Sequence, residues 1–173
     1  VGMVGVSVLF VLLAVVAGAL YVITPLDLRL SGDFSSGHFA VVIAAGLAAG
    51  IAGLYYWAPK LLGRFANEAL GKLSVLLVLG GGALASLPLF VLGFANRFDG
   101  LADAADALNG IAVAGSALMA LALVVAIGAL AAAPKSPRPD DDAWGTGQTL
   151  EWATSSPPVP GNFAELAVVR SAE

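Results

Sequence analysis

The sequence predicts an all-α membrane protein with four transmembrane helices and an extended, polar C-terminal tail. Three observations predict this class. The 173 residues are 59% hydrophobic and only 12% charged, whereas about a quarter of the residues in ordinary soluble domains are charged. Four apolar stretches are each long enough to cross about 30 Å of hydrocarbon. Every Asp, Glu, Lys and Arg lies near the ends of these stretches, between them or after the last one, as the high cost of a charge at the bilayer centre demands.

The apolar stretches define the predicted helices, and proline or charged residues separate them. They run from about Val1 to Ile23, Gly37 to Trp57, Leu73 to Phe94 and Ala107 to Ala132. Pro59 and Lys60 are expected to follow the second helix, and Asp33 is expected to cap its start. We therefore divide the chain into a four-helix transmembrane bundle over residues 1–133 and a tail over residues 134–173. Val1 lies inside an apolar run, which leaves open that residues precede it.

Lysine and arginine predict the orientation of the bundle. The loop after the second stretch carries Lys60, Arg64 and Lys72, and Lys135 follows the fourth stretch. The other two loops each hold a single arginine among several aspartates. By the positive-inside rule, the second loop and the tail face the cytoplasm of a multi-pass protein in the inner (plasma) membrane.

Small residues within the predicted helices indicate close helix packing. Closely spaced glycines occur in the second, third and fourth stretches, among them Gly46, Gly50, Gly53, Gly80, Gly81, Gly82, Gly110 and Gly115. Small residues spaced three or four apart allow helix backbones to approach closely in lipid. This packing is expected within the bundle or onto a larger partner. Tyr55, Tyr56 and Trp57 are expected to form an interfacial aromatic belt where the second helix leaves the membrane.

The composition excludes several functions. Cysteine is absent, which rules out thiolate catalysis and thiolate-held metal centres. No basic stripe exists, so nucleic acid is not an expected partner. The tail is rich in Pro, Asp, Gly, Ser and Thr, yet it contains Trp144, Trp152 and Phe163. Because disordered segments are poor in aromatic residues, we expect these three side chains to be anchored by contact with a partner.

Three segments resemble one known family. The run from Asp142 to Pro158 reads D-A-W-G-T-G-Q-T-L-E-W-A-T-S-S-P-P, and Asn162-Phe163 follows it. The run from Gly53 to Arg64 reads G-L-Y-Y-W-A-P-K-L-L-G-R, with Asn67-Glu68 and Leu70-Gly71-Lys72 after it. A weaker likeness covers Leu26-Asp27, Asp33 and His38-Phe39. Together they resemble subunit one of the haem-copper respiratory oxidases (cytochrome c and quinol oxidases). The resemblance implies that the chain corresponds to the last four helices and tail of that subunit.

The departures from the family pattern concern the cofactor ligands. The family's H-F-H pair ligates two haems, whereas this chain has His38, its only histidine, and Ala40 at the position of the second. The family's arginine pair near the haem propionates is reduced to Arg97. The copper ligands belong to helices that this chain does not include. His38 and Arg97 are therefore candidate haem-binding residues only if the chain completes a split catalytic subunit. Otherwise His38 is a helix-start residue without a ligand role. No catalytic residue and no metal ligand are expected.

Three hypotheses follow. The preferred one is a non-catalytic, subunit-one-like membrane component of an oxidase or its supercomplex, acting in assembly or stability. It binds no cofactor alone, haem and copper lie in the partner subunits, and its partners are other oxidase subunits and lipids. The second is the C-terminal piece of a split catalytic subunit that contributes to haem binding and oxygen reduction. The third is an unrelated small membrane anchor. Whether cytochrome c or a quinol donates the electrons stays open.

Overall fold

A computed structural model of the chain describes residues 2–23, 28, 31–95, 101–135, 139–145 and 149–163. It contains the long helices α1 (Gly2–Tyr21), α2 (Gly32–Leu62), α3 (Glu68–Ala95) and α4 (Ala105–Ala131). The described residues also include the short 3₁₀ helices η2 (Ala102–Ala104) and η3 (Leu150–Ala153), and no strand occurs among them. The predicted all-α class is confirmed.

The four long helices have the length and composition of membrane spans. In the most apolar 18-residue stretch of each helix, only 22% (α1) to 39% (α3) of the residues are buried inside the bundle. Large apolar side chains therefore line the outer faces, among them Val15, Val113 and Leu76. In water these faces would be a strong aggregation hazard, whereas in hydrocarbon they are solvated.

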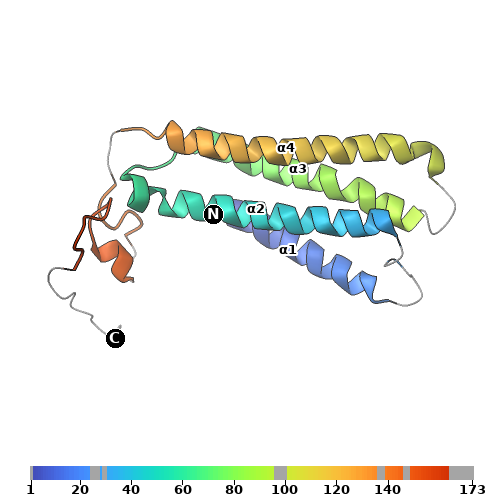
Figure 1. Cartoon of the computed structure of the whole chain (residues 1–173), viewed down its shortest axis with the longest axis horizontal. Helices are drawn as coiled ribbons and strands as arrows, with labels where there is room; N and C mark the ends of the chain where they lie inside the picture. The colour runs from blue at the N-terminus through green and yellow to red at the C-terminus, as the bar shows by residue number, and fades with distance from the viewer. Residues whose placement is uncertain are drawn as a thin grey trace.

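The helices lie antiparallel to one another in an up-and-down bundle (Figure 1). α3 packs against α4 on one side and α2 on the other, and α2 packs against α1. One end of the bundle carries the connections from α1 to α2 and from α3 to α4. The other end carries the α2–α3 connection and the tail (Figure 1). The second loop and the tail thus lie at the same end of the bundle, as their positive charge predicts. That this end faces the cytoplasm stays a prediction.

α2 is longer than its apolar stretch and corrects two predictions about its ends. Ser31, not Asp33, is its N-cap, because the Ser31 hydroxyl accepts a hydrogen bond from the Phe34 amide at 3.2 Å. Asp33 lies in the first turn. Pro59 and Lys60 lie inside the last turn and not after the helix. The hydrophobic pattern marks only the part of a helix that lies in lipid, so it does not reveal polar turns beyond the membrane.

Some of the glycines that the sequence predicts at close helix contacts do lie at such contacts, and others do not. A Cβ on Gly115 would lie 2.6 Å from the backbone carbonyl carbon of Leu84, and one on Gly81 would lie 2.9 Å from the Gly115 oxygen. α3 and α4 therefore cross with their backbones nearly in contact. A Cβ on Gly46, Gly50 or Gly53 would meet nothing within 4 Å, so these three glycines do not serve packing within the described bundle.

Candidate functional site: the aromatic clasp at the end of α2

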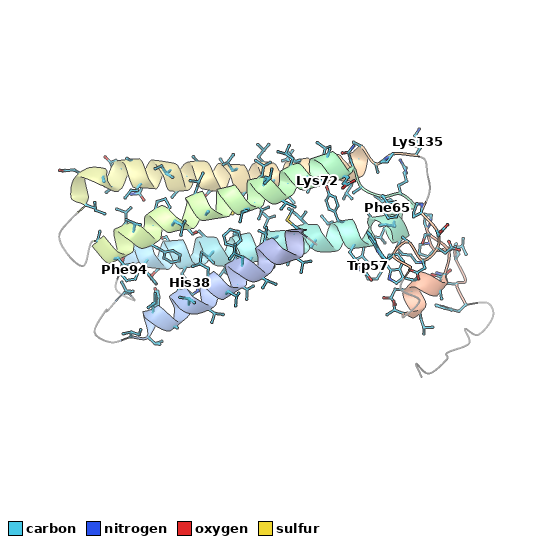
Figure 2. The ribbon with its side chains drawn as sticks, turned by 180° about the vertical axis from the view of Figure 1, so that it is seen from behind. His38, Trp57, Phe65, Lys72, Phe94 and Lys135 are labelled. Carbon is cyan, nitrogen blue, oxygen red and sulfur yellow. The ribbon has the colours of Figure 1, made fainter. Side chains whose placement is uncertain are left out.

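His38 lies near the start of α2, at the end of the bundle that carries Phe94 (Figure 2). Its ring packs against α1. A Cβ placed on Gly18 would lie 3.6 Å from His38 Cε1 and 3.9 Å from His38 Nε2, and the ring centroids of His38 and Tyr21 are 6.1 Å apart. The Tyr21 hydroxyl in turn shares a hydrogen bond with the Ser35 hydroxyl.

The role of His38 as a haem ligand stays a prediction. An axial imidazole needs a ring nitrogen that faces open space wide enough for a porphyrin, and the structure places one side of this ring beside Gly18 of α1. Among the described residues no group of three or more His, Cys, Asp or Glu side chains is arranged to hold a metal ion. Arg97, the other candidate from the sequence, lies outside the described residues. The predicted pairing of His38 and Arg97 at a haem therefore stays a prediction.

The most elaborate polar and aromatic site lies at the opposite end, where the tail folds back onto α2. We call it the aromatic clasp and define it as Tyr56, Trp57 and Lys60 of α2 with Trp144 and Trp152 of the tail. The two tail segments approach α2 beside Trp57 and Phe65 (Figure 2). The clasp contains all three tryptophans of the chain.

Trp152 is the centre of the clasp. It lies on η3, only 2% of it is exposed, and its ring stacks on Trp57 with a centroid distance of 5.6 Å and an interplanar angle of 17°. Its edge meets Tyr56 at 5.4 Å and 86°. The indole Nε1–H donates to the Tyr56 hydroxyl at 3.0 Å. The ring is therefore desolvated while its polar atom has a partner, as a buried tryptophan requires.

Trp144 packs against the ring of Tyr56. The two rings stack at 5.8 Å with an interplanar angle of 6°, and Trp144 Nε1–H donates to the Tyr56 carbonyl oxygen at 3.1 Å. Pro59, in the same turn of α2, has no backbone N–H, so the Tyr55 carbonyl lacks its regular helical partner. Trp144 remains 42% exposed, in contrast to Trp152.

Lys60 and Gly63 hold the tail backbone. Lys60 is 4% exposed, and its Nζ donates to the Thr154 carbonyl oxygen at 2.5 Å and lies 5.7 Å from the Trp152 ring centroid. Both contacts compensate for the loss of hydration of a buried ammonium. Gly63 ends α2 with φ 61°, and a Cβ there would lie 2.9 Å from Pro157 Cδ. Both the backbone angle and the close approach of the tail therefore require glycine.

The α2–α3 loop is also fixed by hydrogen bonds and close packing. The backbone N–H of Asn67 donates to the Ala129 carbonyl oxygen of α4 at 2.9 Å. The side-chain Oδ1 of Asn67 accepts from the backbone N–H of Leu70 at 3.1 Å. A Cβ on Gly71 would lie 2.6 Å from Tyr55 Cε1. The motif residues between Tyr55 and Gly71 thus have structural roles at this end of the bundle.

The clasp corrects one expectation and refines another. The sequence predicts that a partner anchors the tail aromatics, but Trp152 is buried against α2 of the same chain. Phe163 is exposed and makes no ring contact among the described residues. Tyr56 and Trp57, expected to be belt residues, are the surface on which the tail docks. One signal in the sequence points to this docking, since a proline-rich tail with two tryptophans complements an aromatic helix end that also carries a lysine.

Comparison with known proteins identifies the family. Residues 1–131 match the family described as "Cytochrome C and Quinol oxidase polypeptide I". The chain belongs to this family. It is therefore a membrane-spanning part of a haem-copper oxidase subunit I, and the resemblance found in the sequence is confirmed.

Individual relatives extend the likeness into the tail. "Probable cytochrome c oxidase subunit 1-beta" of Nocardia farcinica is 35% identical over 169 residues, which cover 92% of this chain and 29% of the relative. "Cytochrome c oxidase subunit 1" of Bacillus sp. (strain PS3) is 37% identical over 144 residues, which cover 79% of this chain and 23% of the relative. The corresponding subunit of Synechocystis is 32% identical over 158 residues. The chain thus spans less than a third of the length of these relatives.

Proposed function

We propose that this chain is a structural, subunit-I-like component of a membrane-embedded haem-copper oxidase assembly and that it binds neither haem nor copper by itself. The observation that carries the proposal is the reduced set of cofactor ligands, because His38 is the only histidine of the chain and its ring packs beside Gly18 of α1. The family's second histidine position holds Ala40. Haem and copper would then lie in the partner subunits.

The contrast between the two ends of the bundle supports this proposal. The end with His38 has lost the ligand pattern of the family, whereas the clasp end is closely packed and hydrogen-bonded. A chain that carried no redox chemistry but still had to fit an oxidase would keep its contact surfaces and helix packing. Its outward apolar faces, including the small-residue stripe Gly46, Gly50 and Gly53, would pack against other oxidase subunits or lipid.

Location and domain organisation follow from the same proposal. The bundle of residues 1–133 would cross the inner (plasma) membrane, and the tail of residues 134–173 would lie on the cytoplasmic side. The concentration of Lys60, Arg64, Lys72 and Lys135 at the clasp end supports this orientation. The clasp would stabilise this end of the bundle and present it to the neighbouring subunits.

A second function is favoured by a different observation. The likeness to "Probable cytochrome c oxidase subunit 1-beta" covers 92% of the chain, tail included. A chain of this kind could complete a catalytic subunit I whose earlier helices lie on a separate polypeptide. In that case His38 would reach a shared haem, with Arg97 near a propionate.

One purification separates the two functions. The tagged full chain is isolated in a mild detergent, its companions are identified by mass spectrometry, and visible spectra are recorded before and after the companions are removed. We expect haem bands only with the companions, and a companion subunit I that carries its own last four helices. Haem bands that stay with this chain alone would overturn the proposal, and a companion that lacks those helices would establish the split subunit.

Replacing His38 tests the same point in the assembled enzyme. We expect His38→Ala to leave oxygen consumption per haem unchanged, as does the matched control Phe39→Ala at an exposed neighbouring position. A change in the haem spectrum or a large fall in turnover with His38→Ala, absent from the control, would assign His38 to a haem.

A further inference from the structure

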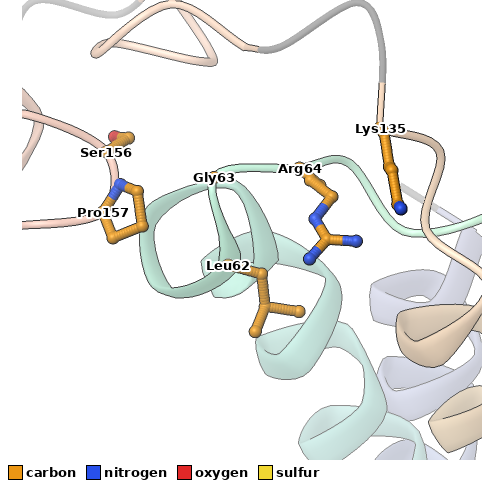
Figure 3. A pocket seen from close by; sticks show the side chains of 6 residues that line it. All are labelled: Leu62, Gly63, Arg64, Lys135, Ser156 and Pro157. Carbon is orange, nitrogen blue, oxygen red and sulfur yellow. The ribbon is translucent and has the colours of Figure 1, made fainter.

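A cavity of 280 Å³ lies where the tail meets the end of α2 (Figure 3). Three segments that are far apart in the sequence form its lining. Leu62, Gly63 and Arg64 come from the end of α2 and the following turn, Lys135 follows α4, and Ser156 and Pro157 belong to the tail. The cavity therefore exists only when the tail is docked.

Two cations converge on this cavity. The side chains of Arg64 and Lys135 extend into the same region (Figure 3), and neither makes an ion pair within the part of the chain that the structure describes. One acidic residue contacts the lining, because Asp141 Oδ1 accepts the Ser156 amide at 3.0 Å and the Asp141 carbonyl oxygen accepts the Ser156 hydroxyl at 3.1 Å. Arg64 and Lys135 are the charged residues among the six described residues that line the cavity, and the acidic run Asp140–Asp142 adjoins it only through Asp141, so the lining itself attracts an anion.

The position of the cations indicates where such an anion comes from. Arg64 follows the last residue of α2 by two positions, and Lys135 follows the last residue of α4 by four. Both are thus the first cations beyond their membrane helices, at the depth of the lipid head groups. The side chain of Leu62, which lines the cavity, is exposed. Cations beside an exposed leucine match an anionic head group and the start of its acyl chains.

We propose that this cavity binds the phosphate group of an anionic phospholipid. The planar Arg64 guanidinium can donate two parallel hydrogen bonds to phosphate oxygens, and Lys135 adds a second charge. The acyl chains then extend from Leu62 toward the apolar outer faces of the bundle. This inference goes beyond the proposed function, because it holds equally for a structural component and for a piece of a split subunit.

Lipid binding and tail docking are linked in this proposal. Ser156 and Pro157 form one wall of the cavity only when the clasp is closed, so a lipid that binds the closed form stabilises it. The three tryptophans all lie in the clasp. Their fluorescence therefore reports docking without an added label.

The test uses the full chain in neutral detergent, titrated with four probes: dioleoylphosphatidylglycerol, dioleoylphosphatidylcholine, glycerol 3-phosphate and inorganic phosphate. Binding is followed by native mass spectrometry and tryptophan emission, and docking by the rate of proteolysis in the tail. We expect tight binding and slower cleavage only with phosphatidylglycerol. Equal binding of phosphatidylcholine, or equal binding of the two water-soluble phosphates, would overturn the assignment to an anionic lipid.

Charge variants locate the site. Arg64→Gln and Lys135→Gln should each weaken phosphatidylglycerol binding by about five-fold or more, the contribution of one basic residue at an anionic membrane surface. The double variant should lose the lipid's effect on tail cleavage. Lys72→Gln is the matched control, because Lys72 is an exposed lysine at the same end that pairs with Glu68 at 2.8 Å.

Two outcomes of this variant series would overturn the site. One is an equal loss with the control Lys72→Gln, which would indicate general surface charge. The other is unchanged binding by the double variant. Helical circular dichroism monitors folding. If the glutamine variants fail to fold, Arg64→Lys and the comparison of the four probes on the unaltered chain decide the question.

Discussion

Replacing Trp152 with alanine should open the clasp without unfolding the bundle. A tryptophan as buried as Trp152, with 2% exposed, removes about 200 Å² from water. At about 25 cal/mol per Å² this burial is equivalent to about 5 kcal/mol. The alanine Cβ retains a small part of it, so the loss falls within the roughly 3–5 kcal/mol typical of removing buried aromatic side chains. Because 1.4 kcal/mol corresponds to a tenfold change, the ratio of docked to undocked tail should fall at least about 100-fold.

The assay is limited proteolysis of the tail, combined with hydrogen exchange of the Trp152 and Ser156 amides, which donate to Thr149 and to Asp141. Cleavage tracks the open population when opening is fast relative to cleavage. Val159→Ala, at an exposed tail position, is the control and should change the docking free energy by less than about 0.5 kcal/mol. The reasoning is refuted if the alanine variant at 152 is cleaved as slowly as the control while its helical signal is intact.

Three further predictions concern backbone and packing. Gly63→Ala should accelerate tail cleavage more than Gly145→Ala, because both glycines have positive φ but only a Cβ on the first meets the tail; equal effects would mean that the contact is unimportant. Gly115→Val should lower the thermal midpoint of the bundle by the equivalent of about 2–3 kcal/mol, while Gly110→Val, with open space around it, should not; a calorimetric scan in detergent compares them. Ser31→Ala should cost about 1 kcal/mol through the lost cap of α2, and hydrogen exchange of the Phe34 amide would detect it.

Much of the fold could be predicted from hydrophobic patterning, because a helix that crosses lipid must be apolar over its central part and carry its charges at the ends. This rule locates the apolar part of each helix. It carries no information on polar turns outside the lipid, so it places the last turn of α2, with Pro59 and Lys60, in a loop. The cap at Asp33 fails for a related reason, since the sequence alone does not identify which of several polar residues has non-helical backbone angles.

The clasp could not be predicted in the same way because it depends on contacts of long sequence separation. Lys60 and Thr154 are 94 residues apart, and Trp152 and Tyr56 are 96 apart. Periodicity reports only local structure, and tryptophans in a proline-rich segment indicate an anchor without naming its receptor. The motif strings around Tyr56 and Trp152 are recognisable separately, and only the fold brings them into one site. Likewise, His38 stands out through a family pattern, but the space in front of its ring depends on how α1 packs.

The length of α2 explains why the clasp and the lipid cavity occur at the same place. Its 31 residues extend about 46 Å at 1.5 Å per residue, whereas the hydrocarbon core is about 30 Å thick. About 16 Å of α2, roughly three turns divided between its two ends, therefore exceeds the hydrocarbon thickness, and the end that carries Tyr56, Trp57 and Lys60 lies at the interface. In that zone Tyr and Trp are stable because each has an apolar body and a polar tip. The docked tail covers those bodies and satisfies the indole tips with Tyr56. An aromatic belt that would otherwise face head groups thus becomes the receptor for the tail, and the cations beside it face the lipid phosphates.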